Sequence, residues 1–151
     1  PAPDFPHTLE GGDADRGRNL FMNHIAAQCI RCHKVKDGKG SDIGPNLKSA
    51  GLQGRSHHLE AIVDPQKTIT EGYGSISLTL ENGQSIAGLF KSEMKGVIEI
   101  KDAEGVITRV ASENVKERTP VISTMPPMGT ILTKREIRDI IEYLSTLKSK
   151  K

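Results

Sequence analysis

The sequence predicts a mainly helical domain with a small antiparallel β unit inserted into it. Two observations support this prediction. Near both ends of the chain, apolar residues recur at steps of three and four, as on one face of a helix. Between about residues 70 and 119, apolar and polar residues alternate instead, as in half-buried strands. We expect one domain over residues 1–151, with a helical core over 13–69 and 120–148 and a β insertion, a meander or small barrel, over about 70–119.

A first helix is predicted from about Ala14 to His24, after a proline- and glycine-rich segment over residues 1–12. Asp13 is in position to cap it. One face of this helix carries a glycine, which permits the close approach of another helix. The members of that face are Ala14, Gly17, Phe21 and Ile25.

Two later helices are predicted from their end signals. Ser56 can cap a short middle helix that ends at Asp64-Pro65. Thr133 and Glu136 have the spacing of a capping box at the start of the last helix. The apolar stripe that follows is expected to pack on the first helix, and its members are Ile137, Ile140, Ile141, Leu144 and Leu147.

Five short strands are predicted within the insertion. Asn82-Gly83 is a two-residue hairpin signal, and Lys95-Gly96 marks another turn. The strand-like runs are Ile76 to Leu80, Ile86 to Phe90, Val97 to Ile100, Val106 to Val110, and one that begins at Val115.

The composition excludes some classes of function. With 21 basic and 19 acidic residues the net charge is +2, too balanced for the clustered basic face of a nucleic-acid-binding protein. No stretch is long and apolar enough for a transmembrane helix. An apolar content of 35% with 3% aromatic residues is low for a self-sufficient core of this size.

The pentapeptide Cys29-Ile30-Arg31-Cys32-His33 has the Cys-x-x-Cys-His spacing of c-type haem attachment. Its two thiols can each bond one vinyl group of the same porphyrin, which places His33 below the iron as the proximal ligand. We therefore expect one covalently bound haem c, held by Cys29 and Cys32. Since these are the two cysteines of the chain, a redox disulfide is the alternative, which the directly following His33 disfavours.

A sixth iron ligand can come from one of four methionines. Met125-Pro126-Pro127-Met128 lies in a loop whose prolines restrict the backbone, so that a ligand there loses less entropy on binding iron. Met22 lies in the first helix and Met94 near a strand turn. A thioether ligand favours the ferrous state compared with a second histidine.

Other polar residues are less favoured candidates for contact with the haem. His24, His57 and His58 are rival axial ligands, each more often a surface or capping residue. Arg55 is either a partner of a haem propionate or an ordinary exposed arginine.

The chain resembles class I c-type cytochromes in Gly44-Pro45-Asn46-Leu47 and in a Met-Pro pair seven residues before the apolar Leu132. In that class the proline carbonyl accepts the second N–H of the proximal histidine, which implies this role for Pro45. The resemblance also implies Met125 as the distal ligand, with Met128 as the less favoured alternative that would otherwise fill a packing position.

From about Asp13 onward the chain also resembles haem-binding domains described from planctomycetes and verrucomicrobia, which often end large predicted dehydrogenases. The segments that carry this resemblance are Arg55-Ser56, Ile62-Val63-Asp64-Pro65, Gly72-Tyr73, Asn82-Gly83-Gln84 and Ser123-Thr124-Met125-Pro126.

These features predict a monohaem cytochrome that transfers one electron, with His33 and Met125 on the iron, and not an enzyme, because no acid–base or nucleophile cluster is present. Its partner would be a redox protein such as a dehydrogenase or oxidase. The alternatives are a haem-based sensor, or a docking module in which the β insertion recognises a partner. Haem attachment of this kind implies a periplasmic or otherwise exported location, and Pro1-Ala2-Pro3 resembles a mature or trimmed start, with no signal peptide in view.

Overall fold

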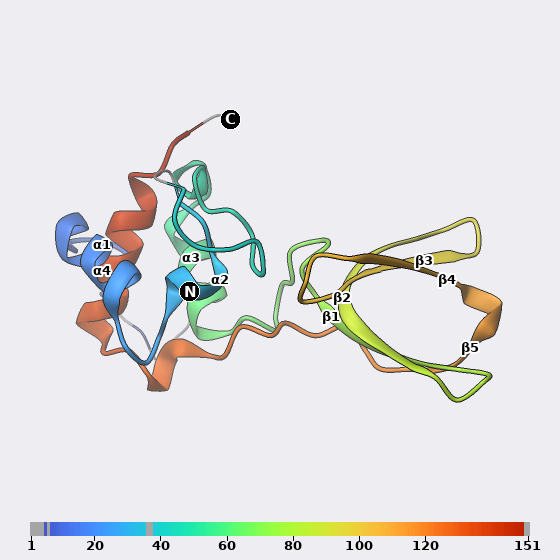
Figure 1. Ribbon diagram of the computed structural model, residues 1–151. Helices are drawn as coiled ribbons and strands as arrows, with labels where there is room; N and C mark the ends of the chain where they lie inside the picture. Colours follow the sequence, from blue (N-terminus) through green and yellow to red (C-terminus); the bar gives the residue numbers. More distant parts are fainter. Residues whose placement is uncertain (1–4, 6, 36–37, 150–151) are drawn as a thin grey trace. The chain divides into compact units, whose positions relative to one another are not determined.

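A computed structural model describes residues 5, 7–35 and 38–149, so Pro1-Ala2-Pro3 lies outside the described residues. The chain divides into two compact units (Figure 1). One consists of Pro1–Thr68 with Met125–Lys151 and is called the helical unit here; the other, Ile69–Thr124, is called the β unit. Within the described residues, no helix combines the length and apolar character needed to cross a bilayer.

The helical unit contains four α-helices and two short 3₁₀ helices among its described residues. Their bounds are α1 (Ala14–Asn23), α2 (Cys29–Cys32), η1 (Ala50–Leu52), α3 (Arg55–Val63), η3 (Met128–Thr130) and α4 (Lys134–Ser145).

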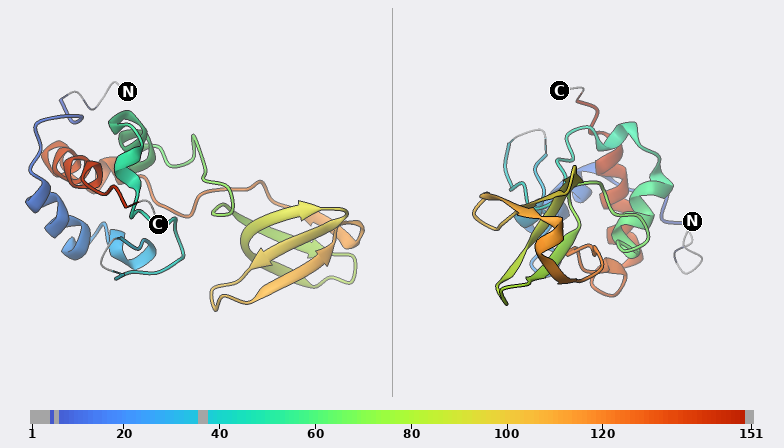
Figure 2. Two further views of the ribbon diagram at one scale, coloured as in Figure 1. Left: turned by 90° about the horizontal axis from the view of Figure 1, so that it is seen from above. Right: turned by 90° about the vertical axis from the view of Figure 1, so that its right-hand side faces the viewer.

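Helices α1 and α4 lie side by side (Figures 1 and 2). Gly17 is the residue of α1 that lies closest against the backbone of α4. A Cβ atom at Gly17 would collide with the backbone carbonyl of Asp139 and lie 2.8 Å from Cβ of Tyr143. Phe21, one turn further along α1, packs on Tyr143 with ring centroids 5.8 Å apart. The absence of a side chain at Gly17 therefore sets how closely the two helices approach.

A buried carboxylate fastens the same crossing. Asp139 of α4 is 2% exposed. Its carboxylate accepts a hydrogen bond from the Asp13 amide at 2.8 Å and one from Arg16 Nε at 3.1 Å. Asp13 itself caps α1, because its side chain accepts from the Arg16 amide. The start of α1 is thus held to the middle of α4, and loss of the Arg16 side chain would leave the buried Asp139 carboxylate with one compensating partner fewer.

The predicted start and apolar face of α4 are confirmed. Glu136 donates its amide to the Thr133 side chain at 3.1 Å, and the Thr133 amide donates to the Glu136 carboxylate at 2.8 Å, which completes the capping box. All five residues of the predicted stripe are at most 5% exposed. They form one core with Phe21 of α1 and with Leu59 and Ile62 of α3.

Two details of the predicted helices are wrong. Ile25 is 87% exposed and does not share the buried face, because α1 ends at Asn23 and the chain turns at His24. Ser56 does not cap α3, since the helix already begins at Arg55 and Gly54 is its N-cap residue. The predicted stop is present, with Asp64 as the C-cap residue.

The β unit is a five-stranded antiparallel sheet with strand order β4-β3-β2-β1-β5. Figure 2 shows how strongly it twists. The bounds are β1 (Ser75–Leu80), β2 (Ser85–Met94), β3 (Val97–Lys101), β4 (Ile107–Ala111), the 3₁₀ turn η2 (Ser112–Asn114) and β5 (Val115–Arg118). Alternate residues of β1, β3 and β4 point into a separate core of Ile76, Leu78, Ile98, Ile100 and Val110.

The Lys95-Gly96 turn lies where it was predicted, between the paired residues Met94 and Val97, but one turn and the second strand depart from the sequence prediction. The Asn82-Gly83 connection is a three-residue loop: the Leu80 amide donates to the Gln84 carbonyl at 2.8 Å, and Gly83 has a φ of +85°. Strand β2 continues to Met94 because its pairing with β3 shifts register between Phe90 and Ser92, which lets one strand bend.

A carboxylate clamp connects β2 to β5 across the sheet. Arg118 donates two hydrogen bonds to the Glu93 carboxylate, at 3.0 and 3.1 Å, and Ser112 donates a third at 2.8 Å. These bonds, first those of Arg118 and then that of Ser112, lower the pKa of Glu93 from 4.5 to about 2.

We predict that Gly17→Ala destabilises the protein although alanine is the better helix former. The added methyl group would force α1 and α4 apart, and overpacking of this kind costs about 1–3 kcal/mol. Denaturant unfolding measures the loss, with Asn19→Ala on the exposed side of α1 as control. Equal stability of Gly17→Ala and wild type would contradict the close crossing.

A second prediction concerns acid. Since Glu93 has a lowered pKa in the folded state, its contribution to the free energy of unfolding is present above pH 4.5 and is lost as the pH falls from 4.5 to about 2. Thermal melts followed by circular dichroism should show that Glu93→Gln removes this part of the acid sensitivity. Glu113→Gln, at an exposed carboxylate of η2, should leave it intact; identical pH profiles for wild type and Glu93→Gln would refute the clamp.

Candidate functional site

The two thiols lie on one short helix directly after a strained turn. Cys29 and Cys32 are the first and last residues of α2 and are both free. Gln28, the residue before Cys29, has a φ of +49°. This left-handed backbone conformation is uncommon for residues other than glycine and asparagine. The turn therefore orients α2 and both of its half-buried thiols.

His33 follows α2 and its imidazole is fixed from one side. Its Nδ1 donates to the Pro45 carbonyl at 2.7 Å, because a proline carbonyl can only accept. This is the contact that the class I resemblance implies. It determines the tautomer of the ring and leaves Nε2 as the nitrogen that can bind a metal.

Two glycines fit closely around His33. A Cβ atom at Gly44 would lie 2.7 Å from Cε1 of the His33 ring, and one at Gly40 would collide with the His33 carbonyl. Gly40 also has a φ of +106°. No role of its own was predicted for either glycine from the sequence, although Gly44 belongs to the segment Gly44-Pro45-Asn46-Leu47 that resembles class I cytochromes c, and its adjacency to Pro45 is the signal that could have identified its role.

Backbone hydrogen bonds hold this loop against the attachment segment. The Gly44 amide donates to the Cys32 carbonyl at 2.6 Å, and the Leu47 amide donates to the Lys34 carbonyl at 2.8 Å. The imidazole orientation is therefore enforced by the backbone on both sides of Pro45.

The protonation states argue against a redox disulfide. Burial raises the pKa of the Cys29 thiol to about 11, whereas reactive Cys-x-x-Cys thiols have lowered values. Burial also lowers the pKa of His33, with the Pro45 hydrogen bond opposing it. His33 is accordingly neutral at physiological pH, which is the form that ligates metals.

The methionine loop belongs to the same unit. Met125 is half-buried and packs against the helical core, as do Cys29 and Ile30. Met128 is 4% exposed and part of that core. Phe5 covers the loop, because a Cβ atom at Gly129 would lie 2.7 Å from its ring.

The other methionines lie elsewhere. Met22 is half-buried on α1 and packs against the helical core. Met94 is 67% exposed at the end of β2, in the β unit.

Arg55 is bonded to protein groups. Its guanidinium donates to the Glu142 carboxylate at 2.9 and 3.1 Å and to the Leu9 carbonyl at 2.8 Å. The Glu142 hydrogen bonds raise the pKa of Arg55, and the same bonds lower that of Glu142. Arg55 thus joins α3, α4 and the N-terminal segment, and its role toward a propionate stays a prediction.

Two of the three rival histidines, His57 and His58, lie on α3, and the third, His24, is the C-cap residue of α1. His57 is exposed and His58 is 4% exposed, with ring centroids 5.6 Å apart. Burial, and then the neighbouring His57, lower the pKa of His58. No described residue bonds Nε2 of His58.

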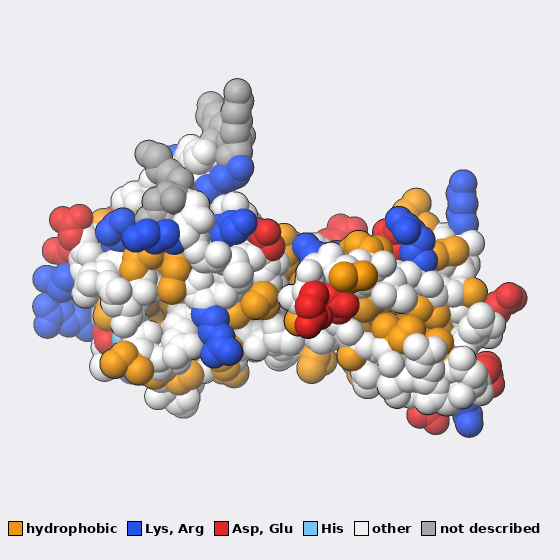
Figure 3. Space-filling model, viewed as in Figure 1, with side chains coloured by type: hydrophobic (Ala, Val, Ile, Leu, Met, Phe, Trp, Pro, Cys, Tyr) orange, Lys and Arg blue, Asp and Glu red, His pale blue; other side chains and the backbone are white. Residues whose placement is uncertain are grey.

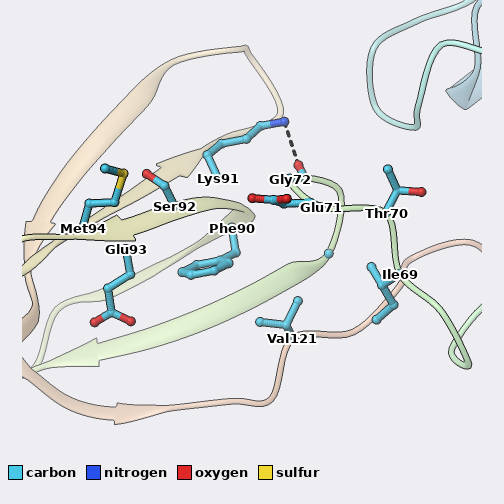
Figure 4. A pocket seen from close by; sticks show the side chains of 11 residues that line it. Ile69, Thr70, Glu71, Gly72, Phe90, Lys91, Ser92, Glu93, Met94 and Val121 are labelled. Atoms are coloured by element: carbon cyan, nitrogen blue, oxygen red, sulfur yellow. Dashed lines mark hydrogen bonds between the residues drawn. The ribbon is translucent and has the colours of Figure 1, made fainter.

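The β unit has a hollow of its own, of about 430 Å³ (Figure 4). Ile69, Phe90 and Val121 surround it, and Lys91 donates to the Gly72 carbonyl at 2.7 Å beside them. Hydrophobic side chains reach the surface of this unit, as Figure 3 shows. Met94, one of the four methionines considered as a sixth ligand, also lines the hollow, whereas Cys29, Cys32, His33 and Met125 do not.

The residues of the helical unit fit a haem. Two free thiols, an imidazole with a fixed tautomer and a thioether are together the donor set of a covalently attached, six-coordinate haem. The close fit of Gly44 against the His33 ring is the local feature that serves such a ligand, since it holds the imidazole plane.

Comparison with known proteins identifies the family. The chain is 32% identical over 110 residues to a cytochrome c of Cochliobolus lunatus. The aligned region is 70% of this chain and 96% of that protein. It is 32% identical over 107 residues to a cytochrome c of Arabidopsis thaliana, and the aligned region is 68% of this chain and 90% of that protein. A 44-residue stretch, which is 29% of this chain and 35% of the relative, is 48% identical to a cytochrome c of Stellaria longipes. No protein-family model matches the chain. The chain belongs to the cytochrome c family.

We predict that Gly44→Ala displaces the His33 imidazole, because the new methyl group would lie 2.7 Å from Cε1. The expected result is a fraction of high-spin ferric haem and a stability loss of about 1–3 kcal/mol. Absorption spectra of the oxidised protein measure the spin state. Gly54→Ala, whose Cβ atom meets nothing within 4 Å, is the matched control. A wild-type spectrum for Gly44→Ala would contradict the proposed fit.

Proposed function

We propose that this protein is a monohaem c-type cytochrome that transfers single electrons. The observation that carries the proposal is the Cys29-x-x-Cys32-His33 segment with the His33 imidazole held by the Pro45 carbonyl. Membership of the cytochrome c family supports it. When bound, the haem supplies the Fe(III)/Fe(II) couple.

The chain's own residues attach and orient this group. Cys29 and Cys32 form the thioether bonds, and His33 Nε2 is the proximal ligand. The Nδ1–H bond to Pro45 increases the electron density of the imidazole and prevents ring rotation. Rigid ligation on this side keeps the geometry similar in both oxidation states, which suits rapid electron transfer.

Met125 is the proposed distal ligand. It is the partly exposed methionine of the loop, whereas Met128 is taken up by core packing. A thioether ligand stabilises the ferrous state and raises the reduction potential. If His33 and Met125 both ligate the iron, no coordination site would be free for a substrate, which is why we propose a carrier and not an enzyme.

We further propose that the helical unit has the class I cytochrome c fold and that residues 69–124 are an insertion into it, as in the planctomycete and verrucomicrobial haem-binding domains. The separate cores of the two units support this view. A redox protein such as a dehydrogenase or oxidase is the proposed partner, and an exported compartment, where c-type haem is attached, is the proposed location.

The decisive experiment compares ferric spectra of wild type, Met125→Ala and Met128→Ala. We expect the far-red methionine-to-iron band in wild type and Met128→Ala, and its loss in Met125→Ala. The reduction potential of Met125→Ala should fall, because the ligand that favours ferrous iron is gone.

Loss of the band in Met128→Ala alone would transfer the ligand role to Met128. A high-spin, five-coordinate ferric haem in wild type would remove the electron-transfer proposal. Rapid carbon monoxide binding by the ferrous wild type would favour the sensor instead.

A further inference from the structure

The turn that precedes Cys29 is organised by one side chain, His24. Nδ1 of His24 accepts hydrogen bonds from the amides of Ala26 and Ala27, at 3.2 and 3.0 Å. The Gln28 amide donates to the His24 carbonyl at 3.1 Å, directly before the left-handed backbone of Gln28. His24 thus determines the path by which the chain leaves α1 and enters the attachment helix α2.

The tautomer of His24 follows from these bonds. A ring nitrogen that accepts from two amides carries a lone pair, so the ring proton resides on Nε2. Nε2 lies 3.4 Å from the carboxylate of Glu136, and the two side chains are 18% and 27% exposed. The positive end of the N–H dipole therefore faces a carboxylate in a partly desolvated position.

Glu136 is at the same time part of the cap of α4. Its other carboxylate oxygen accepts the Thr133 amide at 2.8 Å. Thr133 directly follows the methionine loop, whose last turn is closed by the Ile131 and Leu132 amides donating to the Met128 carbonyl. One carboxylate thus contacts both the haem-attachment turn and the end of the methionine loop.

We infer that His24 is a positioning residue. Through Glu136 it fixes the position of the methionine loop relative to the attachment segment, and it thereby strengthens the bond between Met125 and iron. This inference rests on the proposed function. The two ligands come from distant parts of the chain, and a thioether is a weak iron ligand that external ligands displace. Its occupancy therefore depends on how firmly its loop is held.

Two substitutions separate this role from simple capping. His24→Asn keeps a side-chain oxygen near the position of Nδ1 for the Ala26 and Ala27 amides, but it is too short to reach Glu136. Glu136→Gln keeps an oxygen for the Thr133 amide, since glutamine also forms capping boxes, but removes the charge opposite His24.

The test is a titration of the full-length ferric holoprotein with imidazole, followed by loss of the far-red methionine band. We expect each single variant to bind imidazole about two- to fivefold more tightly than wild type, as the loss of one partly exposed contact between an imidazole N–H and a carboxylate allows. The double variant should bind no more tightly than either single variant, because both remove the same contact.

Glu142→Gln is the matched control, since it removes a different ion pair from the same helix. It should lower the melting temperature and leave imidazole binding unchanged. If His24→Asn and Glu136→Gln bind imidazole like wild type, or if their effects multiply in the double variant, the inference is wrong while the proposed function stands. If wild type itself lacks the far-red band, the proposed function fails first.

Discussion

The crossing of α1 and α4 at Gly17 is the contact on which the helical unit depends. Helix α1 leads into the attachment segment and α4 follows the methionine loop, so the distance between these helices sets the distance between the two proposed ligand segments. The crossing is tight because Gly17 offers no side chain to the Asp139 backbone, and it is fastened because the buried Asp139 carboxylate accepts from both Asp13 and Arg16. A change in this contact would therefore be transmitted to the site.

Features encoded by neighbouring residues were predictable. The Asp13 cap, the Thr133 and Glu136 capping box and the apolar stripe of α4 all depend on spacings of three or four residues. The predicted strands lie within or close to the observed ones for the same reason, since alternation is local. The pentapeptide at Cys29 is equally local, which is why it predicts haem attachment without reference to the fold.

Features that depend on distant residues were not predictable. Arg55 carries a charge whose partner, Glu142, lies 87 positions further along the chain. The helical spacing of Ile25 predicts a place on the buried face, but α1 ends at Asn23 and the His24 side chain accepts the Ala26 and Ala27 amides in the turn that follows. The bend of β2 follows from a register shift against β3, which no local pattern in β2 encodes.

The two halves of the proposed site differ in whether they depend on neighbouring or on distant residues. The proximal half lies within residues 29–45, and its ring orientation depends on short-range backbone hydrogen bonds around Gly44 and Pro45. The distal half depends on contacts between α1 and α4 and on the side chains that join them. Substitutions at a distance should therefore alter the distal ligand more readily than the proximal one. Because the proposed thioether ligand would favour the ferrous state, that is also the half through which the rest of the chain would adjust the reduction potential.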